Sequence, residues 1–128
     1  MIKVHSSAVV AKDTQLAEDV TIGPHCVIGG SVSIGSGTVL DANVVINKNV
    51  KIGKNNHFFA NCVIGDTPQI LGLSPDIETG GLLIGDRNTF REQVTIHPSS
   101  RKGEFTKIGN DNLLMIGVHI GHDCTLED

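Results

Sequence analysis

The sequence predicts an all-β protein in which residues 1–128 coil into a single parallel β-helix domain. The first observation is a six-residue period: every sixth position from Val4 to Ile64 is aliphatic or Phe, and the period resumes in a new phase from Ile84 to Leu126 with one beat skipped. The second is a glycine that often follows the aliphatic residue directly. The third is an Asn, Asp or Gly three places after it, since these residues accept left-handed backbone geometry at a corner. Each hexad is therefore expected to form one short strand and one turn.

Three such hexads close a triangular coil of about eighteen residues, and stacked coils bury the aliphatic positions in a continuous prism. The strands then hydrogen-bond to the coils above and below at ~4.8 Å. An amphipathic α-helix is excluded because apolar residues six places apart lie ~240° apart around a helix and share no face. In chain order, the expected strands contain Val4, Val10, Leu16, Ile22, Ile28, Ile34, Leu40, Ile46, Ile52, Phe58, Ile64, Ile84, Phe90, Ile96, Ile108, Leu114, Ile120 and Leu126. They make about six coils.

The position four places after each aliphatic residue is usually small or β-branched, and all three cysteines fall in this class. Cys26, Cys62 and Cys124 are therefore expected to pack as small thiols in the core rather than to act in catalysis or bind a metal. Their odd number and wide spacing fit neither a disulfide framework nor a four-cysteine zinc site.

Two stretches leave the repeat, and we expect the chemistry there rather than in the regular coils. The first runs near 66–83 and contains two prolines and a Gly-Gly pair. The second runs near 97–107 and contains Pro98, two serines and the pair Arg101-Lys102. Insertions of this kind project from one side of a repeat protein and often build its binding surface.

The composition limits the possible partners. Ten Lys and Arg against fourteen Asp and Glu give a net charge of −4, which argues against a nucleic-acid-binding protein because phosphate neutralisation requires a basic face. No apolar run approaches the ~18 residues that span a bilayer, and the N-terminus lacks the apolar segment of a signal peptide. The sequence therefore predicts no membrane insertion and a cytoplasmic location.

Several motifs resemble those of the hexapeptide-repeat acyltransferases. The Ile-Gly-x-x-x-x units are typical of that family, and more specific segments are Ile-Gly-Asp-Arg-Asn at 84–88, Arg-Glu-Gln-Val-Thr-Ile-His at 91–97, Asp-Asn-Leu-Leu-Met at 111–115 and His-Ile-Gly-His-Asp-Cys at 119–124. Within the family, the chain is most similar to the UDP-N-acetylglucosamine O-acyltransferases of lipid A biosynthesis. The resemblance implies a left-handed β-helix, whereas general chirality rules for parallel strands favour right-handed crossovers.

The resemblance also implies an activity and partners. The expected reaction transfers a 3-hydroxyacyl group from acyl carrier protein, as co-substrate, to the 3-hydroxyl of a UDP-linked amino sugar. The expected assembly is a homotrimer with sites at the subunit interfaces, and neither a cofactor nor a resident metal is expected. In the family, the histidine at the position of His122 is the general base on the sugar hydroxyl. The adjacent carboxylate, Asp123, is expected to fix the tautomer of His122 and to stabilise its imidazolium.

Three further residues are expected to line the substrate cleft. In the family, a histidine at the position of His119 lies beside this cleft. Stacking of one coil on the next should place His97 beside Gly121, and therefore near the base; for each of these two histidines a structural or interface role is equally open. Gln69 is the one residue kept where the family typically reads Gln-Asp-x-Lys, because this chain continues Ile-Leu-Gly. The acceptor sugar is therefore left open.

Two other classes are weighed against the acyltransferase. The γ-class carbonic anhydrases share the β-helix and bind zinc through three histidines, but their close histidine pair is spaced more widely than His119 and His122. The second alternative is a non-catalytic trimeric scaffold. It draws support from the end of the chain in mid-hexad, where the family continues with further coils, the oxyanion donor and a carrier-protein-binding region. We therefore expect a C-terminally truncated chain that is inactive or only weakly active.

Overall fold

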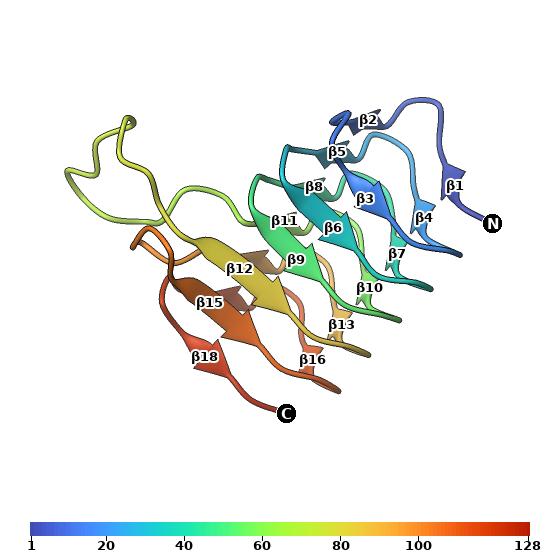
Figure 1. The fold of residues 1–128 in the computed structure, drawn as a ribbon. Coiled ribbons are helices and arrows are strands. Elements are labelled where there is room, and N and C mark those ends of the chain that lie inside the picture. Colours follow the sequence, from blue (N-terminus) through green and yellow to red (C-terminus); the bar gives the residue numbers. More distant parts are fainter.

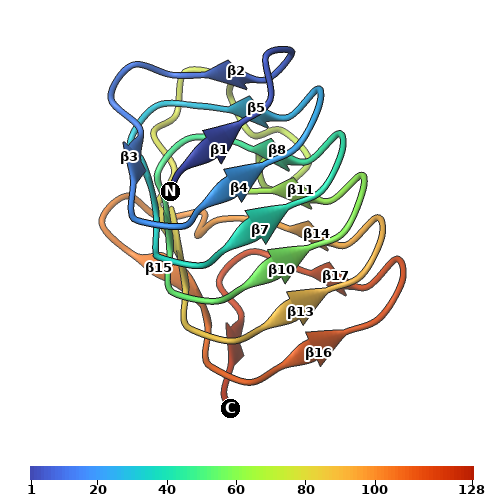
Figure 2. The same cartoon turned by 90° about the vertical axis from the view of Figure 1, so that its right-hand side faces the viewer.

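The computed structural model describes all 128 residues as a left-handed parallel β-helix, which confirms the predicted fold (Figure 1). Eighteen short strands form three parallel sheets of six strands each, one sheet on each side of the triangular prism (Figure 2). Corresponding residues of successive regular coils are eighteen positions apart, as in the pairing of Lys3 with Thr21. No helix in the structure is long and apolar enough to cross a membrane.

The bounds of the strands follow the hexads. Sheet A contains β1 (Lys3–Val4), β4 (Thr21–Ile22), β7 (Val39–Leu40), β10 (His57–Phe58), β13 (Thr89–Phe90) and β16 (Leu113–Leu114). Sheet B contains β2 (Val9–Val10), β5 (Val27–Ile28), β8 (Val45–Ile46), β11 (Val63–Ile64), β14 (Thr95–Ile96) and β17 (His119–Ile120). Sheet C contains β3 (Gln15–Leu16), β6 (Val32–Ile34), β9 (Val50–Ile52), β12 (Gly81–Ile84), β15 (Phe105–Ile108) and β18 (Thr125–Leu126).

The aliphatic position of each hexad points into the prism, as predicted. Ile22 pairs with Leu40, which pairs with Phe58, and the column continues to Phe90. The rings of Phe58 and Phe90 stack with their centres 4.4 Å apart and their planes at 6°, and both side chains are fully buried. Burial is lost at the N-terminal end of this column, where Val4 is 44% exposed.

The corners adopt the predicted left-handed backbone. Eleven residues other than glycine have positive φ: Asp19, His25, Ser31, Asn43, Asn49, Asn55, Asn61, Arg87, Gln93, Asp111 and Asp123. Asp13, which holds the same hexad position in the first coil, is not among them. Close approach explains the glycine that follows many aliphatic positions: a Cβ on Gly35 would lie 2.5 Å from the carbonyl of Gly53 in the next coil.

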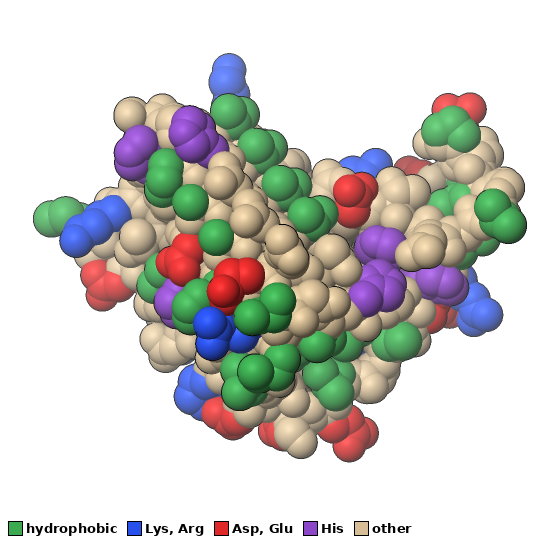
Figure 3. Space-filling model, turned by 180° about the vertical axis from the view of Figure 1, so that it is seen from behind, with side chains coloured by type: hydrophobic (Ala, Val, Ile, Leu, Met, Phe, Trp, Pro, Cys, Tyr) green, Lys and Arg blue, Asp and Glu red, His purple; other side chains and the backbone are tan.

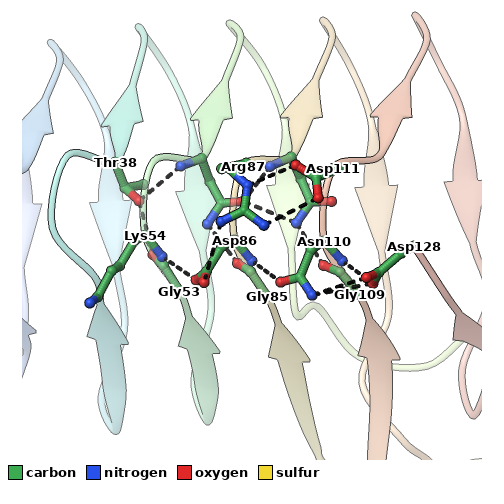
Figure 4. Close-up of polar contacts among 12 residues, drawn as sticks. Thr38, Gly53, Lys54, Gly85, Asp86, Arg87, Gly109, Asn110, Asp111 and Asp128 are labelled. Carbon is green, nitrogen blue, oxygen red and sulfur yellow. Dashed lines mark hydrogen bonds and ion pairs between the residues drawn. The ribbon is translucent and has the colours of Figure 1, made fainter.

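A ladder of polar side chains follows the corner between sheets C and A (Figure 4). Asn56 and Asn88 are buried, and Asn88 donates from Nδ2 to the Oδ1 of Asn56 at 3.1 Å and to the carbonyl of Gly109 at 2.9 Å. Beside them, the Asp86 carboxylate accepts from the amide of Lys54 at 2.7 Å, in the coil before it. These side chains satisfy backbone groups that the corners leave without a strand partner.

Two predictions need correction. The loops are shorter than expected, because Gly81–Ile84 and Phe105–Ile108 pair along four residues as β12 and β15 and belong to sheet C. Cys26 and Cys62 are buried as predicted and donate to carbonyl oxygens, but Cys124 is exposed. It lies in the last coil of this structure, where no further coil covers it.

Candidate functional site

Three histidines gather where sheet B meets the second loop. The pairing of β14 with β17 places Thr95 beside His119 and Ile96 beside Ile120, and the amide of His97 then donates to the carbonyl of Ile120 at 3.1 Å. This register confirms the prediction that His97 stacks near Gly121. Figure 3 shows histidines grouped beside the projecting loop.

His122 and Asp123 form a hydrogen-bonded pair at the corner after β17. The Nδ1 of His122 lies 2.7 Å from the Oδ2 of Asp123, and the two side chains are 37% and 32% exposed. An Nδ1–H donated to the carboxylate leaves the Nε2 of His122 as the nitrogen with a free lone pair. The pair therefore has the geometry of an oriented general base.

The second loop holds the Asp123 carboxylate from its other side. The hydroxyl of Ser99 donates to Oδ1 at 2.5 Å, the hydroxyl of Ser100 donates to Oδ2 at 2.6 Å, and the amide of Ser100 lies 3.2 Å from Oδ1. The hydrogen bonds from Ser100, Ser99 and His122 hold the pKa of Asp123 well below its usual range. Asp123 is thus kept ionised at neutral pH.

His97 and His119 meet edge to face, with ring centres 4.7 Å apart. The Nδ1 of His119 shares a hydrogen bond of 2.8 Å with the hydroxyl of Thr95, whereas the buried Nδ1 of His97 has no protein partner. Burial lowers the pKa of His97, and the neighbouring charges of His119 and His122 lower it further, while Asp66 acts in the opposite direction. The neutral ring of His97 is therefore favoured.

Gln69 stands apart from this cluster. It is exposed on the first loop and makes no hydrogen bond to any of the three histidines. The residue of this loop that acts on the cluster is Asp66, through its charge on His97.

The two loops lie against each other. The amide of Gly80 donates to the carbonyl of Ser99 at 2.7 Å, and the ammonium of Lys102 lies 2.6 Å from the carboxylate of Glu78. Between the loops and the adjoining corner is a polar cavity of about 420 Å³. The loops therefore support one another, and through Ser99 they support Asp123.

Sequence reasoning gave no role to Ser99, Ser100, Thr95 or Thr106. Thr106 accepts the amide of Asp123 at 2.9 Å from the strand that follows the second loop. One signal in the sequence could have indicated the two serines. They directly follow Pro98, and the register of β14 with β17 places Pro98 opposite His122.

The outward side of sheet B is apolar along most of its length. Val9, Val27, Val45 and Val63 stand in register on β2, β5, β8 and β11, and the same column continues to Thr95 and His119. Figure 3 shows this row of hydrophobic side chains ending at the histidines. Val9 is 64% exposed and Val27 is 43% exposed.

The chain has no group of three or more His, Cys, Asp or Glu side chains arranged to hold a metal ion. The three histidines are instead engaged with Asp123, with Thr95 and with each other.

Comparisons with known proteins find similarity to UDP-N-acetylglucosamine O-acyltransferases. The chain is 50% identical over 62 residues to an acyl-acyl-carrier-protein UDP-N-acetylglucosamine O-acyltransferase of Rickettsia conorii, which covers 48% of this chain and 23% of that protein. The solved UDP-N-acetylglucosamine acyltransferase of Francisella novicida is 43% identical, with a TM-score of 0.92 over 100% of this chain and 46% of that one. That of Moraxella catarrhalis is 41% identical, with a TM-score of 0.92 over 98% and 48%.

The chain thus spans about half the length of the solved enzymes that it matches, and the aligned segment is about a quarter of the curated relative. No family model matches the chain.

Proposed function

We propose a function for this chain from its membership of the hexapeptide-repeat acyltransferase family, in which it corresponds to the N-terminal half of the UDP-N-acetylglucosamine O-acyltransferases. The proposed reaction transfers a 3-hydroxyacyl group from acyl carrier protein to the 3-hydroxyl of a UDP-linked amino sugar, an early step of lipid A biosynthesis. The observation that carries the proposal is the hydrogen-bonded pair of His122 and Asp123 beside His97 and His119. The chain carries the part of the site that activates the acceptor.

In the proposed mechanism, the Nε2 of His122 accepts the proton of the sugar hydroxyl as the oxygen attacks the carbonyl carbon of the thioester. A carbon–oxygen bond forms, the carbon–sulfur bond breaks, and the proton passes to the leaving thiolate of the carrier. Asp123 stabilises the imidazolium that exists between these two transfers, as carboxylates do in other His-based catalysts. No cofactor is required for this step.

His97 and His119 are the proposed contacts of the sugar on the same face. A neutral His97, favoured by burial, offers its ring to the sugar without adding a second positive charge beside the base. Gln69 is proposed as a contact from the first loop, and its exposure leaves its amide free to reach a ligand. We propose that the first loop determines which amino sugar is accepted.

A homotrimer is the proposed assembly. Four valines in register on the outward side of sheet B form an apolar row, and a row of this kind is buried when β-helices pack side by side. The row ends at His119, so a neighbouring subunit packed on it would close the cleft beside the histidines. We propose the cytoplasm as the location, because acyl carrier protein and nucleotide sugars are found there.

The test is a chimera, because the chain spans about half of the enzymes that it matches. Residues 1–128 would replace the matching segment of the Francisella novicida enzyme, and transfer of a labelled 3-hydroxyacyl group from acyl carrier protein to UDP-N-acetylglucosamine would be measured. We expect turnover in the chimera and a loss of about 10²-fold or more in kcat on His122→Ala.

The matched control is His5→Ala, because His5 is an exposed histidine on the first coil whose side chain hydrogen-bonds only to Ser7. It should leave kcat unchanged. Turnover that survives His122→Ala would show that another residue is the base. A folded chimera that transfers no acyl group would instead favour the scaffold alternative.

A further inference from the structure

The Asp123 carboxylate is held by more donors than its pairing with His122 requires. Ser99 reaches Oδ1, Ser100 reaches Oδ2, and the amide of Ser100 lies within 3.4 Å of both oxygens. Asp123 follows β17, whereas both serines come from the second loop, more than twenty residues earlier in the chain. The orientation of the carboxylate therefore depends on where the loop places two hydroxyl groups.

We propose that Ser99 and Ser100 are positioning residues, which fix the plane of the Asp123 carboxylate so that it selects the Nδ1–H tautomer of His122. The catalytic part of this inference rests on the proposed function, in which the Nε2 of His122 is the base. The structural part does not, because the tautomer of His122 is a property of the unliganded chain. Neither serine hydrogen-bonds to His122, whereas both hydrogen-bond to Asp123, so their effect on His122 passes through Asp123.

Ser99 is rigidly placed for this role. Its side chain is fully buried, and its amide and carbonyl bond to Gly81 and Gly80, which join the first loop to sheet C. Its Oγ also accepts from the amide of Arg101 at 3.1 Å, and of the two acceptors within reach of the hydroxyl proton, Asp123 at 2.5 Å is much closer than the carbonyl of Arg101 at 3.4 Å. The second loop therefore presents Ser99 from a framework of strands rather than from a free loop tip.

Asp123 itself is constrained from the backbone. Its φ of 64° lies in the left-handed region, and its amide donates to the Oγ1 of Thr106 at 2.9 Å. The main chain at Asp123 thus sets the position of the carboxylate but leaves its rotation to the partners of the carboxylate itself. Without the two hydroxyls, those partners are the His122 ring at 2.7 Å and the amide of Ser100 at the longer distances of 3.2 and 3.4 Å.

The other titratable groups near His122 do not provide the same control. His97 and His119 hydrogen-bond to neither His122 nor Asp123, and the charge of Asp66 acts on His97. The low pKa of Asp123 reflects chiefly the two serines, in agreement with strong donation to its ionised form.

The experiment is ¹⁵N NMR of the histidine side chains in the chain of residues 1–128, at a pH where His122 is neutral. The wild type should show one tautomer of His122, protonated at Nδ1. The double variant Ser99→Ala with Ser100→Ala should shift His122 toward a mixture of both tautomers and raise the pKa of Asp123. Ser100→Thr keeps the hydroxyl and should keep the wild-type signal.

Ser33→Ala is the control, because Ser33 lies on β6 in sheet C, where it pairs with Lys51 of β9 rather than with any residue of the site. The single variant Ser100→Ala is included because loss of the buried Ser99 hydroxyl could unfold the loop, whereas Ser100 is partly exposed. In this variant we expect a smaller shift of His122 toward the mixture of tautomers. A single Nδ1–H tautomer that persists in Ser100→Ala and in the double variant would overturn the proposal.

The chimera separates this inference from the proposed function. Loss of the Ser99 and Ser100 hydroxyls should lower kcat by about tenfold with little change in KM. A change of tautomer without a change of kcat would support the positioning role and count against His122 as the base. A loss of kcat without a change of tautomer would count against the positioning role.

Discussion

The ring of His97 packs edge to face against that of His119, while its own Nδ1 is buried without a partner in the chain. A buried nitrogen without a partner is rare in folded proteins and costs free energy unless a ligand or water satisfies it. The state of His97 is therefore sensitive to any ligand or water that reaches this nitrogen.

His97 should titrate below the ordinary imidazole pKa of 6.5, because burial penalises its charged form. The unfolded chain then binds more protons than the folded chain just below pH 6.5, so this contribution to stability is present above that pH and is lost as the pH falls through the folded pKa. His97→Gln should flatten the fall in stability between about pH 7 and pH 5. Urea unfolding at a series of pH values measures this, and an unchanged slope would contradict it.

The stacked pair of Phe58 and Phe90 should carry much of the core stability. Phe58→Ala removes a fully buried ring and should lower the free energy of unfolding by about 3–5 kcal/mol. Leu71→Ala is the comparison, because Leu71 is fully exposed on the first loop. Chemical denaturation of both variants should separate them clearly, and equal stabilities would show that the prism can close around the cavity.

Close stacking of the coils should make Gly35 intolerant of a side chain. A Cβ there would lie 2.5 Å from backbone atoms of Gly53, so Gly35→Ala must push two coils apart and should cost about 1–3 kcal/mol or more. Gly30→Ala is the matched control, because its Cβ would meet only Asp13 oxygens at 3.6 Å or more. Thermal unfolding of the two variants compares them, and a stable Gly35→Ala would mean that the coil spacing can expand.

The valine row should be an interface if the proposed trimer forms. Light scattering of the wild-type chain should give three times its 13.6 kDa. Val27→Glu places a charge in the middle of the row and should give the mass of a monomer, because an unpaired charge is costly to bury. Ser33→Glu, on the outward side of sheet C, should leave the mass unchanged. A trimer that tolerates Val27→Glu would show that another face is used.

The repeat was predictable because its chemistry is local. An aliphatic residue every six positions determines which side chains face inward, and Asn49 and Asp111 adopt the left-handed corners that their side chains favour. Register between neighbouring coils follows from the period, and so the position of His97 beside Gly121 could be inferred from the spacing of residues alone.

The rest of the site was not predictable in the same way. Ser99 and Ser100 reach Asp123 only because the second loop folds back across the edge of the coil, and no period governs that path. The six-residue period also does not predict where the two loops end. Leu82 and Thr106 are buried in the extended strands β12 and β15, and pairing between coils rather than local pattern determines where those strands begin.

The polar ladder at the corner between sheets C and A requires that the helix change in length by whole coils. Asn56 and Asn88 bond across adjacent coils, so a shift of one residue would remove both from their partners and bury unpaired amides. A chain built this way can lengthen or shorten by whole coils, or by loops that leave at a corner, without disturbing its neighbours. Single-residue insertions within a strand should be excluded. The length of such a molecule therefore changes in steps, and equivalent surface positions on different coils are separated by whole multiples of the height of one coil.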